Sequence, residues 1–151
     1  MLQLAVHQDW SAVCALSRYV HTTHVQWRPD IYCVTDEPYP LEMFLEDISK
    51  RVVYVAKMEE TVVGFVRLSI REINSTGLIQ KKQMCLESIS VEEALRGHGV
   101  GRTMLQEVRL LAKVFGCQEL VLAVYPENDG AVSFFQKCGF FIRSVTMDMR
   151  L

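Results

Sequence analysis

VEEALRGHGVGR, residues 91–102, is the most informative stretch of the chain, because it joins a predicted strand to a strongly amphipathic predicted helix. Its three glycines stand at alternate positions, and glycine lets a backbone turn tightly and approach a ligand closely. The free N–H groups of the helix's first turn would point at one spot, with the positive end of the helix dipole behind them. We therefore predict a pyrophosphate site here. Its residues, including two arginines that add charge, are Arg96, Gly97, His98, Gly99, Val100, Gly101 and Arg102.

Three other interpretations of this glycine-rich loop are open. A P-loop requires a Lys-Ser or Lys-Thr pair after its last glycine, and that pair is absent. A dinucleotide-binding fingerprint, which would indicate NAD, requires a glycine where the chain has Arg102. A glycine-rich turn that binds no ligand is the third alternative, since a lone glycine pattern is a weak signal.

The segments around the loop predict an α/β (α+β) protein with a mixed, largely antiparallel sheet and helices on both of its faces. The helix over 100–115 has one apolar stripe and ends at Gly116. Within the strand expected over 61–70, Gly64 suggests a bulge or a close backbone approach. No linker or repeat divides the chain, so we expect a single domain over 1–151. The strands are expected at 2–6, 52–56, 61–70, 83–91, 120–124 and 140–151, and the other helices near 11–20, 41–48 and 129–137.

Composition excludes several classes of protein. A formal net charge of −2 gives no basic field for nucleic acid, and no apolar stretch approaches the ~18 residues of a membrane span. The chain begins without the features of a secretory signal. Its five cysteines form no C-x-x-C pair, which disfavours disulfides and zinc and favours the reducing cytoplasm. His21 and His24 lack a close acidic partner, so we predict no metal site.

A second motif follows the helix over 100–115 and the short strand after it. Residues 128–140 read NDGAVSFFQKCGF, and the strand before the loop reads LESISV over 86–91. Together with the R-x-x-G-x-G pattern of 96–101, these segments resemble the GNAT superfamily of N-acetyltransferases. The specific resemblance covers about residues 84–142, and the order of elements extends it to the whole chain.

The resemblance implies a six- to seven-stranded sheet in which the strands at 86–91 and 120–124 are parallel and splay apart. It also implies acetyl-CoA as the acyl donor, with pantetheine lying along backbone at the splay as an added strand. A backbone N–H near Ile89 would stabilise the tetrahedral oxyanion. Besides the loop, the cofactor-binding residues implied are Ile89, Ser90, Val91, Asn128, Phe134 and Lys137. Asn128 would hold the cofactor or its loop, and Lys137 would meet the outer phosphate or remain a solvated lysine.

Glu87 is the candidate general base that takes a proton from the attacking amine. Strand parity places it on one face with Cys85, Ile89 and Val91, and partial burial there would raise the pKa of its carboxyl. In several GNAT enzymes a glutamate on this strand is proposed as base. A bulge that turns Glu87 outward, or an ion pair with an arginine, is the alternative.

The group that protonates the leaving thiolate departs from the family pattern. The motif's usual tyrosine is replaced by Phe135. Tyr125 lies just before the motif and is our candidate substitute, with water or a purely packing role for Tyr125 as alternatives.

The acceptor amine is expected near the loop between the first two helices. The candidate substrate residues are His24, Trp27, Arg28 and Tyr32. They suit a small molecule or a peptide, although each also has an ordinary packing or turn role open to it. A catalytically silent acyl-CoA-binding module is the second functional hypothesis. The segment 141–151 could pair across a two-fold axis in a homodimer, or form an internal edge strand.

Overall fold

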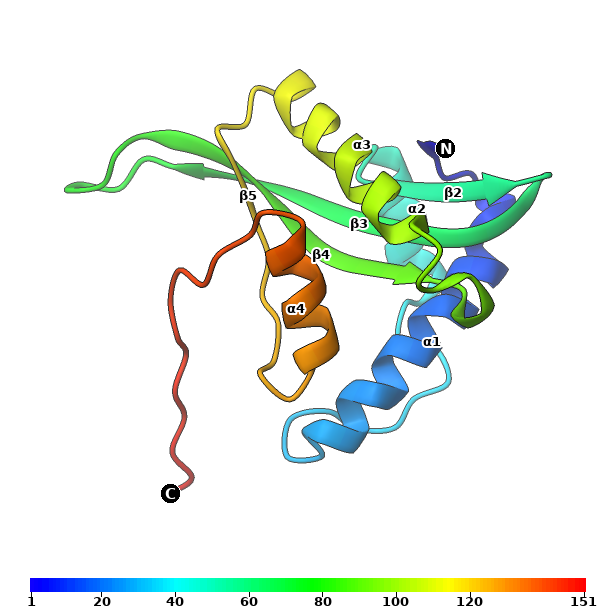
Figure 1. The fold of residues 1–151 in the computed structure, drawn as a ribbon, viewed down its shortest axis with the longest axis horizontal. Helices are drawn as coiled ribbons and strands as arrows, with labels where there is room; N and C mark the ends of the chain where they lie inside the picture. The colour runs from blue at the N-terminus through cyan, green and yellow to red at the C-terminus, as the bar shows by residue number, and fades with distance from the viewer.

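Runs of consecutive buried residues along the central strands build one sheet that is covered by helices on both faces (Figure 1). The computed structural model describes all residues from 1 to 151. The strands are β1 (Leu2–Leu4), β2 (Val53–Met58), β3 (Thr61–Ile73), β4 (Lys81–Val91) and β5 (Glu119–Val121). The helices are α1 (Trp10–Trp27), α2 (Leu41–Ser49), α3 (Val100–Val114) and α4 (Asp129–Lys137), with short 3-10 turns at His7–Asp9 and Glu93–Leu95.

The sheet has the order β1-β2-β3-β4-β5, so strands adjacent in the sequence are also neighbours in space. Its first three pairings are antiparallel and the β4–β5 pairing is parallel. The predicted mixed, mostly antiparallel sheet is therefore confirmed, with five strands rather than six or seven.

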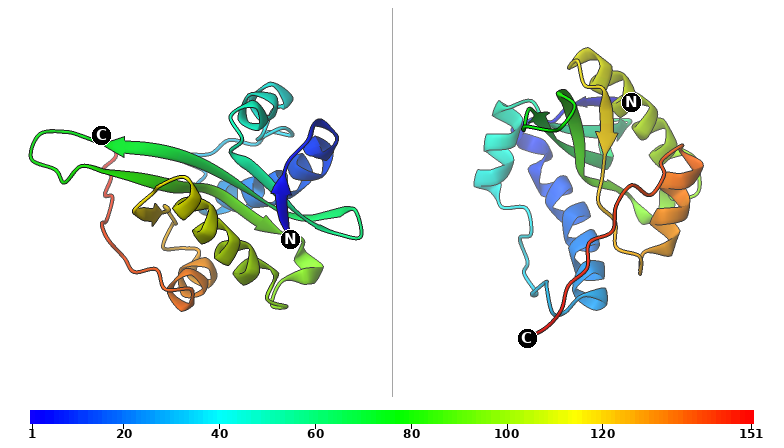
Figure 2. Two further views of the ribbon diagram at one scale, coloured as in Figure 1. Left: turned by 90° about the horizontal axis from the view of Figure 1, so that it is seen from above. Right: turned by 90° about the vertical axis from the view of Figure 1, so that its left-hand side faces the viewer.

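Two apolar cores lie on opposite faces of the sheet (Figure 2). Met104 and Val108 of α3 and Phe135 of α4 are buried in one core. Val13 of α1 and Phe44 of α2 are buried in the other. Helices therefore cover both faces, as predicted, and none of them has the combination of length and apolar character that a membrane span requires.

The parallel pairing of β4 with β5 is short. It joins Gln83 to Glu119, Met84 to Leu120 and Cys85 to Val121, and stops there. β4 continues to Val91, but beyond Cys85 it is paired only with β3. The strand expected over 120–124 thus ends at Val121, and the edge of β4 over residues 86–91 is left without a neighbouring strand.

The strand expected over 140–151 is absent from the structure, and that prediction is wrong for the isolated chain. Residues 141–151, which we call the C-terminal arm, are extended but form no backbone hydrogen bond with any other segment. Only side-chain ion pairs hold the arm, including one between Arg143 and Glu119 at 3.0 Å. Since a strand is defined by its pairing, an apolar pattern alone does not make one.

Gly64 shows both of the features predicted for it, because it lies beside a bulge and its backbone closely approaches another strand. The register of β2 against β3 shifts between Ala56 and Lys57, next to the Ala56–Gly64 pair. A Cβ atom on Gly64 would lie 2.8 Å from the carbonyl oxygen of Ser90 and 3.0 Å from the sulfur of Met104. Glycine is therefore required by close packing at this position.

We expect Gly64→Ala to lower the free energy of unfolding by about 1–3 kcal/mol, because the added methyl group overpacks a tight site. The measurement is urea denaturation followed by circular dichroism. Gly130→Ala is the matched control: it adds the same atom to α4 where nothing lies within 4 Å, and it should be neutral or stabilising. Equal stabilities of the two variants would contradict the packing argument.

Candidate active site

The loop that leads from β4 into α3 carries a row of unused hydrogen-bond donors. None of the backbone N–H groups of residues 97–102 donates to an acceptor within the protein, and the first such bond at this end of α3 is from Thr103 N to the Gly99 carbonyl at 3.0 Å. Gly97 and Gly99 have φ of 79° and 89°, a backbone conformation that residues with a side chain rarely adopt. A Cβ atom added to either glycine would have no other atom within 4 Å. The loop is thus shaped as an exposed anion cradle, with the dipole of α3 behind it.

Arg96 is fixed at the base of this loop. Its Nε donates to the Val91 carbonyl at 3.0 Å, and its guanidinium carbon lies 4.1 Å from the centre of the Tyr19 ring. The Arg96 carbonyl is in turn 2.9 Å from Nδ1 of His98. Arg96 therefore connects the loop to α1 while its charge remains beside the free amides.

α4 closes the side of the loop. A Cβ on Gly101 would lie 3.3 Å from the ring of Phe134 and 3.7 Å from Val91, so Phe134 packs directly against the first turn of α3. Asn128 caps α4, its Oδ1 accepting from the Ala131 N–H at 3.1 Å. Lys137 is exposed at the far end of α4 and forms no ion pair. The structure thus gives Asn128 a structural bond that leaves its amide nitrogen free.

Phe135, at the motif position where the family usually has tyrosine, is a core residue. It is 9% exposed and packs with Phe134 and Phe140, with ring centroids 5.3 Å and 5.6 Å away. A phenylalanine here fills the apolar core and offers no proton.

Ile89 and Val91 contact the core beneath α3, whereas Ser90, between them, points to the opposite face. Ser90 is 5% exposed, and its hydroxyl has no hydrogen-bond partner. Burying an unpaired hydroxyl is costly. Ser90 lies on the part of β4 that is not paired with β5.

Glu87 does not share a face with Ile89 and Val91, so the parity prediction is wrong there. Arg67 pairs with Ser88 and Leu68 with Leu86, which makes Glu87 the extra residue of a β-bulge. The bulge reverses the alternation and directs Glu87 to the α1–α2 side, the side of Cys85. There it is exposed, accepts a hydrogen bond from Ser69 and lies 3.7 Å from Arg71. The predicted partial burial of Glu87 is therefore wrong, and both features of the alternative, a bulge and an arginine partner, are present.

Four of the residues predicted from separate segments form one cluster. The hydroxyls of Tyr32 and Tyr125 are 3.1 Å apart. The His24 ring stacks on Tyr32 at 5.1 Å between centroids and meets the Tyr125 ring edgewise at 5.8 Å. The Arg28 guanidinium lies 5.6 Å over the Tyr125 ring. This aromatic cluster joins the end of α1 to the loop that follows β5, while Trp27 only flanks it beside His24.

Burial sets the protonation of this cluster. It lowers the pKa of His24 from 6.5, with the nearby His21 adding to the effect. It also raises the pKa of Tyr32 to about 12, together with the hydrogen bond to Tyr125. Arg28 donates two hydrogen bonds to Asp30, at 3.0 and 2.8 Å, and this pairing raises the pKa of Arg28 and lowers that of Asp30. At neutral pH the cluster therefore holds neutral rings beside a fixed cation.

Comparison with known proteins identifies the family. The profile described as "Acetyltransferase (GNAT) family" matches residues 19–140. The chain belongs to the GNAT acetyltransferase family. YwnH of Bacillus subtilis, a candidate phosphinothricin acetyltransferase, is 31% identical over 139 residues, which cover 92% of this chain and 82% of YwnH. An N-alpha-acetyltransferase of Sulfurisphaera tokodaii is 28% identical over 111 residues, 69% of this chain and 66% of that protein.

Solved structures share the GNAT fold. A mutant of the BH1408 protein from Bacillus halodurans has a TM-score of 0.95 and 24% identity, covering 100% of this chain and 99% of that one. An aminoglycoside N-acetyltransferase, AAC(6')-Iy, solved in complex with CoA, has a TM-score of 0.68 and 20% identity over 100% of this chain and 93% of that one. These likenesses concern the fold.

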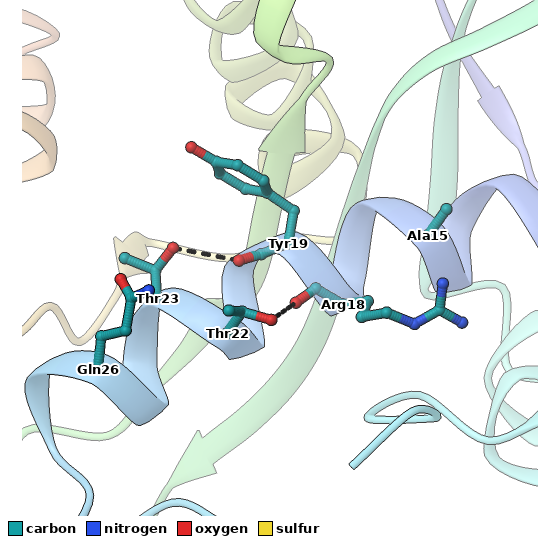
Figure 3. A pocket seen from close by; sticks show the side chains of 6 residues that line it. All are labelled: Ala15, Arg18, Tyr19, Thr22, Thr23 and Gln26. Atoms are coloured by element: carbon teal, nitrogen blue, oxygen red, sulfur yellow. Dashed lines mark hydrogen bonds between the residues drawn. The ribbon is translucent and has the colours of Figure 1, made fainter. Parts of the chain in front are cut away.

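A hollow of about 430 Å³ lies along the exposed face of α1 (Figure 3). The Tyr19 ring on its wall contacts the Arg96 guanidinium, so the hollow adjoins the glycine loop between β4 and α3. It contains none of the predicted catalytic residues, and it is lined by Ala15, Arg18, Tyr19, Thr22, Thr23 and Gln26. The hollow also includes no residue of the aromatic cluster.

Three residues of the site were not anticipated. Ser69 and Arg71, which contact Glu87, stand on alternate positions of β3, and this polar spacing was the available signal. Tyr19, which supports Arg96, had no sequence signal. No group of three or more His, Cys, Asp or Glu side chains is arranged to hold a metal ion.

We expect the stability of the protein to fall as pH drops through about 6.5, with part of the loss due to His24. Its folded-state pKa is lowered, so below the unfolded value the unfolded chain binds the proton more readily. Urea denaturation at pH 7.5 and 5.5 should show a smaller difference in unfolding free energy for His24→Gln than for the unsubstituted protein. A difference of the same size in both proteins would contradict this assignment.

Proposed function

We propose that this protein transfers the acetyl group of acetyl-CoA to a primary amine of a small molecule or peptide. The observation that carries the proposal is the row of unpartnered N–H groups over residues 97–102 beside the unpaired edge of β4. A diphosphate is the natural ligand for such a row at a helix N-terminus. An extended pantetheine arm is suited to a free strand edge.

The family assignment supports the following placement of the donor. The diphosphate would bind the amides of the loop, with Arg96 supplying positive charge. The pantetheine arm would follow β4 past Val91 toward Ile89, whose backbone N–H would meet the thioester oxygen. Phe134, packed on Gly101, would border the diphosphate end of this path.

The chemical step needs a base for the amine and an acid for the thiolate. The protonated amine loses one proton to Glu87, directly or through water, and its lone pair attacks the thioester carbon. The C–N bond forms, the C–S bond breaks, and the nitrogen releases its second proton to water, which replaces the proton that the acid gives to the thiolate. Tyr125 gives its hydroxyl proton to the thiolate and is reprotonated from water. Glu87 is kept as the proposed base because its carboxylate lies on the sheet face that α1 covers, and the end of α1 carries His24 of the aromatic cluster.

The acceptor would lie against the aromatic cluster. Neutral His24 and the paired tyrosine hydroxyls can accept hydrogen bonds from an amine without repelling it by charge. The names of the relatives include phosphinothricin, N-alpha and aminoglycoside acetyltransferases. These three classes of amine are therefore the first to test.

A catalytically silent acyl-CoA-binding module is the second candidate function. Phe135 favours it, because the position of the usual acid is occupied by a buried ring. Both candidate functions include acetyl-CoA binding, but only the enzyme transfers the acetyl group. Measuring binding and acetyl transfer separately therefore distinguishes them.

Acetyl-CoA binding is tested by isothermal titration calorimetry of Gly99→Ala against Gly116→Ala. Both substitutions force a methyl group onto a positive φ, at 89° and 72°, at opposite ends of α3. We expect Gly99→Ala to weaken acetyl-CoA binding at least tenfold, because it disturbs the amides of the loop, and Gly116→Ala to leave it unchanged. Absence of heat for the unsubstituted protein at millimolar acetyl-CoA would exclude both candidate functions.

Turnover is tested by thiol release from acetyl-CoA with polyamines, amino acids, phosphinothricin, aminoglycosides and peptide N-termini. For an accepted amine, Glu87→Gln should lower kcat at neutral pH by about 10²–10⁴-fold while the affinity for acetyl-CoA is unchanged. Arg71→Gln, which alters the neighbour of Glu87, is the control and should have a smaller effect. Tight binding without release for any amine would favour the silent module, and an unchanged kcat would remove Glu87 as the base.

A further inference from the structure

The buried ring of Phe135 and the tyrosine pair of the aromatic cluster lie toward opposite faces of the sheet. Phe135 on α4 is buried in the core beneath α3 and offers no proton to a leaving thiolate. Tyr32 and Tyr125 belong instead to the cluster at the end of α1, a helix whose core lies on the other face. That end of α1 lies beside the loop that leads into α4 (Figure 1). A chain without a hydroxyl at position 135 therefore has two hydroxyls 3.1 Å apart on the side of α1.

The register of the sheet brings Tyr125 to the level of the proposed thioester site. The last pair of β4 with β5 is Cys85 with Val121, and the two strands run in the same direction. Four residues further along each segment are Ile89 and Tyr125. The bulge at Glu87 changes this count by one residue. Counting along the chain therefore places Tyr125 across the splay from the backbone that is proposed to meet the thioester oxygen.

The surroundings of the two hydroxyls distinguish the one that releases a proton from the one that keeps it. Burial and the hydrogen bond to Tyr125 raise the pKa of Tyr32 to about 12, so Tyr32 retains its proton. The guanidinium of Arg28 lies 5.6 Å over the ring of Tyr125 and is held by two hydrogen bonds to Asp30. A cation over an aromatic ring is attracted to its electrons, and the attraction grows when the ring carries the charge of a phenolate. Tyr125 is therefore suited to lose a proton, and Tyr32 to donate a hydrogen bond to it.

Ring contacts hold both tyrosines in place. The ring of His24 stacks on Tyr32 with 5.1 Å between centroids and an interplanar angle of 25°. Both of these rings meet the ring of Tyr125 edgewise, at 5.8 Å and 6.0 Å between centroids. A reactive group that is held by its neighbours needs little reorganisation to reach its working position.

We propose that Tyr32 is a positioning residue that makes Tyr125 the general acid for the leaving thiolate. This inference rests on the proposed acetyl transfer. The Tyr32 O–H donates to the Tyr125 oxygen, which leaves the proton of Tyr125 free to point into the splay. As the C–S bond breaks, its electron pair stays on sulfur and takes the proton of Tyr125. The Tyr125 phenolate keeps the hydrogen bond from Tyr32 and regains a proton from water. If the hydrogen bond ran the other way, the proton of Tyr125 would be engaged by Tyr32 and withheld from the thiolate.

A double-mutant cycle tests whether Tyr32 acts through Tyr125. With an amine that the protein accepts, we expect Tyr125→Phe to lower kcat by about 10²-fold and Tyr32→Phe by about tenfold. The affinity for acetyl-CoA, measured by calorimetry, should be unchanged in both. The double variant should be no slower than Tyr125→Phe alone, because Tyr32 then has no acid to position. The control is Tyr54→Phe, which removes a tyrosine hydroxyl in the core beneath α3 and should leave kcat unchanged.

Rescue by a conservative replacement separates a donor role from a packing role. Phenylalanine keeps each ring and its contacts with His24 and Arg28, and circular dichroism checks that each variant is folded. 3-Fluorotyrosine incorporated at position 32 keeps the hydroxyl donor and should restore kcat. A variant at position 32 that retains the donor and is still slow overturns the inference.

The remaining outcomes separate this inference from the function on which it rests. If Tyr32 only contacts the acceptor, Tyr32→Phe raises the KM for the amine and leaves kcat unchanged. If Tyr32 only supports the fold, its effect multiplies with that of Tyr125→Phe. Either result overturns the role of Tyr32 and leaves the acetyl transfer standing. An unsubstituted protein that binds acetyl-CoA but releases no thiol with any amine overturns the acetyl transfer, and the role of Tyr32 with it.

Discussion

The separation of β4 from β5 after Cys85 and Val121 is the constraint on which the rest of the structure depends. Parallel strands that stayed paired would bury both edges and leave no room for an extended ligand. Here β4 remains bonded to β3 as far as Val91, so the departure of β5 exposes backbone without dissolving the strand. The same departure delivers Tyr125 to the end of α1 and leads β4 straight into the glycine loop. The proposed cofactor path and the proposed acceptor wall therefore share one cause.

The local features of the fold could be predicted because they depend on short-range chemistry. The alternate glycines of 97–101, the apolar stripe of α3 and the turn residues around Asn128 act within a few positions of one another. The resemblance to the GNAT family added the pairing of distant segments. The convergence of His24, Tyr32 and Tyr125 could be anticipated only through that resemblance, since no local pattern links residues so far apart in the chain.

Two predictions failed because they required information from outside the segment concerned. The face of Glu87 followed from strict alternation, and one inserted residue opposite Arg67 and Leu68 reverses that alternation. A bulge has no composition signal at this position. The segment 140–151 has the alternation of a strand, but a strand also requires backbone pairing, and residues 141–151 bond to no other segment. In both cases the alternation of polar and apolar residues is present in the sequence, but backbone pairing determines which face a side chain occupies and whether a strand forms.

Arg96 links the glycine loop to helix α1, which also carries His24 of the aromatic cluster. Its guanidinium bonds the end of β4 and lies on Tyr19, so the anion loop rests mechanically on α1. Five residues further along the same helix is His24, which stacks on Tyr32. Helix α1 therefore contacts the proposed donor site near its middle and the proposed acceptor site near its end. Substitution of Tyr19, on a helix face that looks like ordinary surface, would alter the alignment of donor with acceptor.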